Sequence, residues 1–286
     1  MRWKDLRRSS NVRDVRGAGG GGRMPLGRGG RGIGGGIGVL VILGLAFVLG
    51  GPEAVMQLLS GSGGVAPSGE QGAPLTANDE ASDFVARVLG STEDVWGALF
   101  AQAGETYQAP ELTLFGGAVQ SACGYASAAS GPFYCPGDHR VYLDTTFFDE
   151  LARMGGPGDF AAAYVIGHEV GHHVQTLLGT SDQVRAAQQR GNQVEANRLQ
   201  VAMELQADCF AGVWANHANQ AARVLEPGDV EEGLGAAAAI GDDRLQRSAG
   251  RSVTPDSFTH GSSAERQRWL KNGLTSGDPS ACDTFN

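Results

Sequence analysis

Apolar and polar residues are distributed unevenly along the 286-residue chain, and this pattern predicts four parts. Residues 33–51 are apolar apart from their glycines and carry no charge, which is long enough for a helix that spans a bilayer. Residues 52–75 are rich in Gly, Ser, Pro and Ala, a composition typical of a flexible linker. Residues 76–286 show the regular apolar spacing of a folded domain. Residues 1–32 are basic and Gly-rich, and we expect a separate tail.

Within the domain, the apolar spacing predicts mainly helices. Thr76 to Asn78 can cap a helix through residues 84–89, and a capping box at Ser91–Asp94 predicts a second helix through residues 95–100. Two short strands are predicted at 112–115 and 139–144. Further helices are predicted over residues 159–178, 193–217 and 228–246. The expected fold class is therefore α+β, mostly helical with a small sheet, behind a single N-terminal transmembrane helix.

The predicted helix over residues 159–178 contains His168-Glu169-Val-Gly-His172 in an apolar setting. Residues four apart lie on one face of a helix, so His168 and His172 can bind one tetrahedral zinc ion. Glu169, on the same turn, can take a proton from the water that attacks the substrate. This spacing predicts a zinc-dependent peptidase site.

A second segment, Glu204-Leu-Gln-Ala-Asp208, supplies carboxylates four residues apart on a later helix. A catalytic zinc site uses three protein ligands, and Glu204 can be the third. Asp208 can accept the outer N–H of a ligand histidine and so fix its tautomer. Asp208 itself and Glu195 are the alternative third ligands.

These two segments resemble the gluzincin peptidases, and are especially similar to the HtpX-like and CAAX-prenyl membrane peptidases. Nearly the whole chain outside the linker resembles the YpfJ-like neutral zinc metallopeptidases of bacteria. The resemblance includes the Cys-containing segment 123–136, residues 204–212 and the segment 259–266. It implies a zincin-like metallopeptidase domain, one Zn²⁺ per chain and a protein or peptide substrate.

His260 is the other candidate catalytic residue. A peptidase needs a hydrogen-bond donor for the oxyanion that forms when water attacks the carbonyl. Thr259-His260-Gly261 is similar to the Thr-His-Pro segment of HtpX-like enzymes, with Gly261 in place of Pro. The resemblance implies that His260 stabilises the oxyanion, and a nearby Tyr is the alternative donor.

The charge of the chain is split. Residues 1–32 hold nine Arg and Lys against two Asp, a net charge of +7, whereas the whole chain carries −9. The positive-inside rule then places the N-terminus in the cytoplasm and the domain outside a bacterial inner membrane, with residues 33–51 as the anchor. A cleaved signal peptide and a buried core helix are the alternatives for this segment. We expect no nucleic-acid partner.

The four cysteines predict disulfides if the domain lies in an oxidising compartment. Cys123 and Cys135 are close in sequence and form the favoured pair, which leaves Cys209 with Cys282. Four cysteines allow three pairings, and free buried thiols are a further alternative.

Two classes of function fit these features. The first is a membrane-anchored zinc metallopeptidase in which Glu169 is the general base. The second is a zincin-fold binding or assembly protein whose metal site is structural or inactive. Glu169 favours the first class, because a structural site does not need a base.

Overall fold

Small residues allow the helices at the centre of the described residues to pack with their backbones close together. The computed structural model describes residues 1–16 and 79–286, which belong to one compact unit. Helix α4 (Asp159–Leu177) contacts α6 (Gln193–Ala222) at Gly171, where a Cβ atom would lie 2.9 Å from the carbonyl oxygen of Ala207. Glycine is therefore required at this contact, which joins the His-Glu-x-x-His helix to the helix that carries Glu204.

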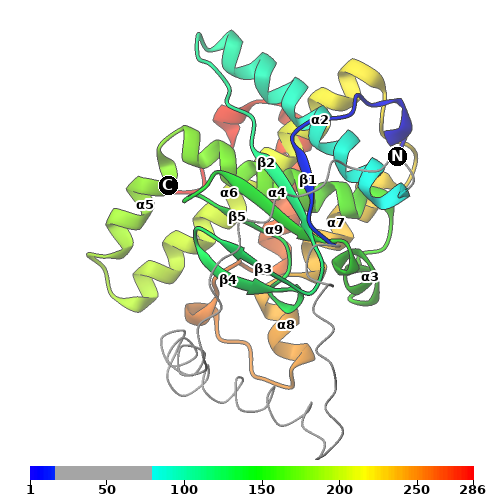
Figure 1. The fold of residues 1–286 in the computed structure, drawn as a ribbon. Coiled ribbons are helices and arrows are strands. Elements are labelled where there is room, and N and C mark those ends of the chain that lie inside the picture. Colours follow the sequence, from blue (N-terminus) through cyan, green and yellow to red (C-terminus); the bar gives the residue numbers. More distant parts are fainter. Residues whose placement is uncertain (17–78) are drawn as a thin grey trace, which may run out of the picture. The chain divides into compact units, whose positions relative to one another are not determined.

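Helix α9 (Ser263–Ser276) packs against the other side of α6 in the same way. A Cβ atom at Gly273 would overlap the carbonyl oxygen of Cys209. Helix α7 (Asp229–Ala239) contacts both α4 and α9, so four helices form one layer of the structure (Figure 1). The candidate site lies where α4, α6 and α9 meet.

A small sheet packs against α4 and α2 (Glu80–Gln102) (Figure 1). Its strand order is β1-β2-β6-β5; the first three strands are parallel, and β5 is antiparallel at one edge. The apolar residues of β2 and β6 are buried in the core. A separate hairpin contains β3 and β4. The strands are β1 (Val12–Asp14), β2 (Glu111–Phe115), β3 (Ala118–Ser121), β4 (Gly124–Ser127), β5 (Phe133–Cys135) and β6 (Arg140–Asp144).

The mainly helical α+β part of the predicted fold class agrees with the structure, but several boundaries differ. The two helices predicted between residues 78 and 100 are one continuous helix, α2, which Asp79 caps. The helix predicted over 228–246 is divided into α7 and α8. Helix α8 spans Asp242–Ser248. Helix α9 was not predicted, nor were α3 (Thr146–Arg153), α5 (Thr180–Gln188) and the short 3₁₀ turns η1 (Trp3–Asp5), η2 (Ala128–Ser130), η3 (Pro255–Ser257) and η4 (Pro279–Ala281).

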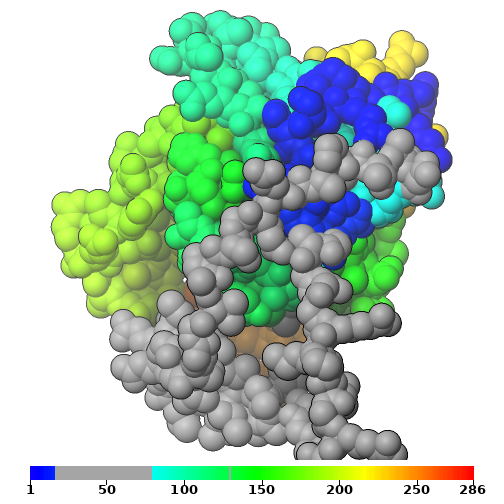
Figure 2. Space-filling model, in the orientation of Figure 1, coloured from blue at the N-terminus to red at the C-terminus, as the bar shows by residue number. Residues whose placement is uncertain are grey.

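Residues 1–16 are part of the folded unit, and the prediction that residues 1–32 form a separate tail is wrong for them. Val12 pairs with Leu112 in the parallel ladder between β1 and β2. Trp3 and Leu6 are buried in the main core. Figure 2 shows this segment in blue, lying on the surface beside α2 in cyan. The folded domain therefore includes residues from both sides of the predicted anchor.

The positive charges of this segment are paired within the domain. Arg7 forms ion pairs with Glu93 and Asp94 of α2, and Arg16 binds Asp14 and Asp79. These ion pairs give the Arg residues of the N-terminal segment a structural role within the domain, whereas the positive-inside rule assigned their charges a role in membrane orientation.

The transmembrane part of the predicted fold class is corrected. No helix in residues 1–16 and 79–286 is both long enough and apolar enough to cross a membrane. The predicted anchor (33–51), the linker (52–75) and residues 17–32 of the tail lie outside the described residues. Because β1 and β2 share one sheet, residues 1–16 belong to the same folded unit as residues 79–286, and the side of a membrane on which this unit lies stays a prediction.

Candidate metal centre

Helices α4 and α6 bring together the three predicted zinc ligands. Nε2 of His168 lies 3.2 Å from one carboxylate oxygen of Glu204, and Nε2 of His172 lies 3.5 Å from the other. The two imidazole rings are 4.7 Å apart at their centres, and the three ligand atoms lie within 4.8 Å of one another. His168 and Glu204 are buried, and His172 is partly buried.

The alternative third ligands lie elsewhere. Glu195 is at the start of α6, where its carboxylate accepts a hydrogen bond from the backbone N–H of Asn192 in a capping box. Asp208 lies behind His168, with its Oδ1 atom 2.8 Å from Nδ1 of that ring. Glu204 is therefore the carboxylate that faces both histidines.

A fully buried ion pair supports His168. Arg266 of α9 donates from Nε and from a terminal nitrogen to the two carboxylate oxygens of Asp208, at 2.9 and 3.0 Å. The hydroxyl of Tyr164, one turn before His168, also donates to Asp208 at 2.5 Å. Burial opposes the charge of Asp208, but the charge of Arg266 lowers the pKa of its carboxyl group. Asp208 thus stays ionised and orients His168.

A neutral side chain supports His172. Its Nδ1 atom lies 2.9 Å from Oε1 of Gln175, which is completely buried. Gln175 was not among the predicted site residues, although its position three residues after His172 places it next to that ring on the helix.

The donor set fits a zinc ion. The Nδ1 atoms of His168 and His172 each face an acceptor oxygen, so each Nδ1 carries the ring proton and each Nε2 keeps a free lone pair. The two Nε2 atoms and the Glu204 carboxylate therefore converge as acceptors, and a positive charge is needed between them. Burial opposes protonation of His168, but the charge of Asp208 and the hydrogen bonds that Asp208 and Glu204 accept from the ring raise the pKa of His168 to about 10. Burial also opposes the charge of Glu204, yet the two histidines hold the pKa of its carboxyl group well below the usual value. Two histidines and one carboxylate form the ligand set of several catalytic zinc sites.

The metal ligands lie on the wall of a cleft of about 520 Å³. One face of α4 lines this cleft for about three turns, or about 16 Å. Glu169 is on this face beside the ligands and is 7% exposed. Strand β5, α5, α6 and the loop before α9 provide other parts of the wall. The α4 residues in the cleft are Tyr164, Val165, His168, Glu169, His172 and Thr176.

The structure places His260 in the same cleft. Its backbone N–H donates to Oδ2 of Asp242 at 2.6 Å, and its Nδ1 atom lies 3.2 Å from Oδ1. The same carboxylate accepts the backbone N–H groups of Thr259 and Gly261. Asp242, at the start of α8, therefore holds the loop that presents His260.

Two tyrosines line the cleft, Tyr164 of α4, whose hydroxyl donates to Asp208, and Tyr134 of β5. The hydroxyl proton of Tyr134 is engaged as well. Nε2 of His173 lies 2.6 Å from the carbonyl oxygen of Gln108, which can only accept, so this nitrogen carries a proton. Burial lowers the pKa of His173 to about 4, so the ring is neutral near pH 7. Its Nδ1 atom therefore accepts from the Tyr134 hydroxyl, 3.1 Å away.

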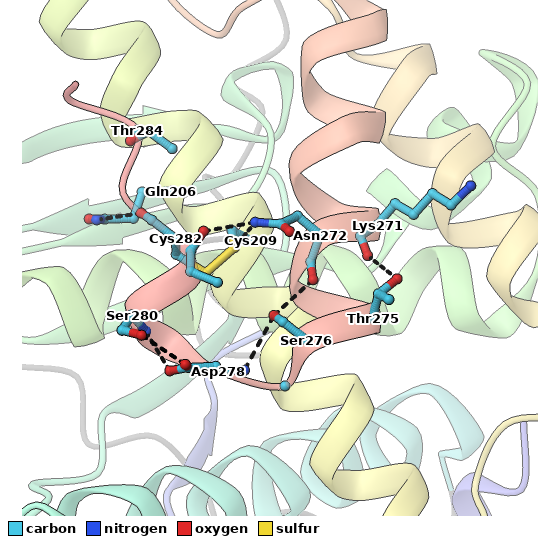
Figure 3. The surroundings of a disulfide bond; sticks show 12 residues. Gln206, Cys209, Lys271, Asn272, Thr275, Ser276, Asp278, Ser280, Cys282 and Thr284 are labelled. Carbon is cyan, nitrogen blue, oxygen red and sulfur yellow. Dashed lines mark hydrogen bonds between the residues drawn. A yellow bond between two sulfur atoms is a disulfide. The ribbon is translucent and has the colours of Figure 1, made fainter.

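The structure contains two disulfides. Cys123 pairs with Cys135 at β5, and Cys209 of α6 pairs with Cys282 near the C-terminal end, which is the favoured pairing. Figure 3 shows the second disulfide beside Gln206 of α6 and Asn272 of α9. It attaches the last residues to the helix that carries Glu204 and Asp208.

Comparison with known proteins gives relatives along the full chain. A family profile described as "Putative neutral zinc metallopeptidase" matches residues 1–285. An Escherichia coli (strain K12) protein, "Uncharacterized protein YpfJ", is 47% identical over 298 residues, which cover 100% of this chain and 99% of the relative. "Uncharacterized protein Rv2575" of Mycobacterium tuberculosis (strain ATCC 25618 / H37Rv) is 44% identical over 207 residues, 68% of each chain. No solved structure gives a significant match.

Proposed function

The chain belongs to the putative neutral zinc metallopeptidase family, and we propose that it hydrolyses peptide bonds in a protein or peptide substrate. His168, His172 and Glu204 would hold the zinc ion. Zinc bound there would make water more acidic and polarise the scissile carbonyl group. The remaining chemistry belongs to side chains of the cleft.

Glu169 is the proposed general base. It lies on the same turn of α4 as His168, and it lines the cleft. Its carboxylate would take the proton of the attacking water and then give it to the leaving amine. The cleft follows α4 for about 16 Å, which is enough for an extended segment of about five residues.

His260 is the proposed donor to the oxyanion. Tyr134 cannot take this role while its hydroxyl proton is donated to His173. An imidazole that carries both protons donates from Nε2 as well as from Nδ1, and the Nδ1 atom of His260 lies 3.2 Å from Oδ1 of Asp242. Arg266 also lines the cleft, but its donors are directed to Asp208 and Tyr164.

The observation that carries this proposal is the open side of the metal centre. Structural zinc sites are closed by four protein ligands, whereas catalytic sites keep one position for water or substrate. Here two histidines and one glutamate border a cleft that Glu169 also lines. This arrangement favours hydrolysis over the alternative of a binding or assembly protein with a structural or inactive metal site.

We also propose that the domain works in an oxidising compartment. Two disulfides with no free cysteine support this location, because thiols in the cytoplasm are kept reduced. Alkylation of the protein from intact cells, with and without prior reduction, would test it. Four reactive thiols without reduction would contradict this location.

Glu169→Gln tests the proposed catalysis. The variant should fold and bind zinc like the wild type, and its rate of peptide cleavage should fall by about 10²–10⁴-fold because the general base is missing. Glu105→Gln, an exposed change of the same chemistry, should keep the wild-type rate. Wild-type rates in Glu169→Gln would refute the assigned role, and a zinc-loaded wild type that cleaves no member of a peptide library would favour the binding or assembly function.

A further inference from the structure

A continuous chain of hydrogen bonds joins His172 to the C-terminal disulfide. Nδ1 of His172 lies 2.9 Å from Oε1 of Gln175. Nε2 of Gln175 donates to Oε1 of Gln206 at 3.0 Å, and also to the carbonyl oxygen of Met203 at 2.8 Å. Nε2 of Gln206 then donates to the carbonyl oxygen of Cys282 at 3.0 Å (Figure 3). Two side-chain amides thus connect α4, α6 and the C-terminal segment.

The chemistry of these groups fixes which atom is the donor and which is the acceptor in each hydrogen bond. A backbone carbonyl can only accept, so the NH₂ group of Gln206 faces Cys282 and its oxygen faces Gln175. The NH₂ group of Gln175 must therefore face Gln206 and Met203, which turns its oxygen toward His172. Nδ1 of His172 is the donor, and its Nε2 lone pair faces the metal centre.

We propose that Gln175 and Gln206 are positioning residues that hold His172 in its metal-binding tautomer. This inference rests on the proposed zinc site. The Gln175–Gln206 relay, defined as His172, Gln175, Gln206 and the Cys282 carbonyl, does for His172 what Asp208 does for His168. A partner on the outer nitrogen fixes the ring and raises its basicity as a ligand.

The far end of the relay is fixed by covalent and hydrogen bonds. Cys282 is 1% exposed and is bonded to Cys209, one turn after Gln206 on α6. Asn272 of α9 donates to the carbonyl oxygen of Ala281 at 2.7 Å, and the Thr284 hydroxyl donates to that of Ala202 at 2.6 Å. The segment that carries the carbonyl oxygen of Cys282 is therefore anchored both before and after that residue.

Gln175→Met and Gln206→Met test the relay. Each keeps the approximate side-chain size and removes the amide. Gln175→Met removes the only partner in the relay that contacts His172, so zinc affinity should fall by about 10–100-fold. Gln206→Met should lower the affinity less, because Met203 still orients Gln175. Zinc affinity is measured by competition with a chelator, and the Nδ1 proton of His172 is followed by NMR in the zinc-loaded protein.

Gln120→Met is the matched control, because it makes the same change at an exposed amide of β3, which donates to the carbonyl oxygen of Ser121 and lies outside the relay and its anchors. It should leave zinc affinity and the His172 Nδ1 proton signal unchanged. In Gln175→Met that proton should exchange faster with water. Wild-type zinc affinity in folded Gln175→Met would overturn the relay. If Gln175→Met does not fold, equal affinities in Gln206→Met and Gln120→Met would overturn it. A wild type without zinc would instead refute the proposed function.

Discussion

The two histidines of the metal centre lie one turn apart, yet different kinds of network support them. Behind His168, a buried carboxylate is balanced by a buried guanidinium, Asp208 with Arg266. Behind His172, the Gln175–Gln206 relay is neutral and ends at the Cys282 carbonyl. The first support connects α4 through α6 to α9, and the second connects α4 through α6 to the C-terminal segment.

The difference between these supports predicts how each of them fails. A buried ion pair is stable only when both charges are present, because one charge left alone in the interior is very costly. A neutral amide relay loses less when one member is removed, since the remaining groups carry no net charge. Substitutions in the ion pair behind His168 should therefore lower the free energy of unfolding of the whole domain. Substitutions in the relay behind His172 should mainly lower the affinity for zinc.

The largest expected effect follows from Arg266→Met. This change leaves the Asp208 carboxylate buried without its cation, and the free energy of unfolding should fall by about 3–5 kcal/mol. Denaturant unfolding of the metal-free protein measures it. Adding Asp208→Asn to Arg266→Met should recover part of the loss. Arg268→Met, an exposed change on the same helix, should alter stability by less than about 0.5 kcal/mol. A similar small change for Arg266→Met would contradict the comparison.

The two disulfides provide the next test. Cys209–Cys282 closes 73 residues and Cys123–Cys135 closes 12, so replacing both cysteines of a pair by Ser should cost about 4 and about 3 kcal/mol of unfolding free energy, respectively. Only the Cys209/Cys282 variant should also bind zinc more weakly, because only that disulfide anchors the relay. Chelator competition on both variants separates the two effects. Equal zinc affinity in the two would count against a role of the C-terminal disulfide in the site.

Gln175→Glu sharpens the comparison, because it places a charged support behind the second histidine. The new carboxylate attracts His172, but it has no N–H for the oxygens of Met203 and Gln206. We expect the free energy of unfolding to fall by about 1–3 kcal/mol, the cost of unsatisfied buried acceptors. Gln189→Glu, an exposed change, is the control in the same unfolding experiment. A more stable Gln175→Glu protein would show that charge, and not directional hydrogen bonding, is what His172 requires.

The smallest expected effect is a change in how stability depends on pH. It concerns Asp243, a carboxylate that contacts neither the ion pair behind His168 nor the relay behind His172. Burial would raise the pKa of Asp243, but hydrogen bonds from Ser263 and Arg247 lower it to about 2, from 3.8. A lowered pKa in the folded state stabilises the protein above pH 3.8, and this contribution is lost as pH falls through about 2. Asp243→Asn should therefore lose less stability than the wild type between pH 4 and pH 2. Parallel acid-unfolding curves of the two proteins would contradict this assignment.

The sequence predicted the parts of the site that depend on local spacing. His168, Glu169 and His172 belong to one helix, and Glu204 and Asp208 belong to another, so periodicity alone groups them. Gln206 and Cys282 are 76 residues apart and meet only through the tertiary fold. No local pattern indicates such a contact.

The errors in the fold also have physical causes. Ser91 and Thr92 resemble a helix start, but within α2 their hydroxyls bond to Trp214 Nε1 and to the carbonyl oxygen of Leu89. The pairing of β1 with β2 joins residues about a hundred positions apart, so residues 1–16 were assigned by charge alone. Helix α7 ends before Gly241, where a Cβ atom would overlap Ser263.

The zinc content of the purified protein tests the central claim most directly. The wild type should bind one zinc ion per chain, and His168→Ala, His172→Ala and Glu204→Gln should each lose it or bind it far more weakly, because each removes one of three ligands. Asp208→Asn should keep the ion with about 10–100-fold lower affinity, because it removes only the group that orients His168. Full zinc occupancy in the His168, His172 or Glu204 variants, or loss of zinc from Asp208→Asn while Glu204→Gln retains it, would contradict the account.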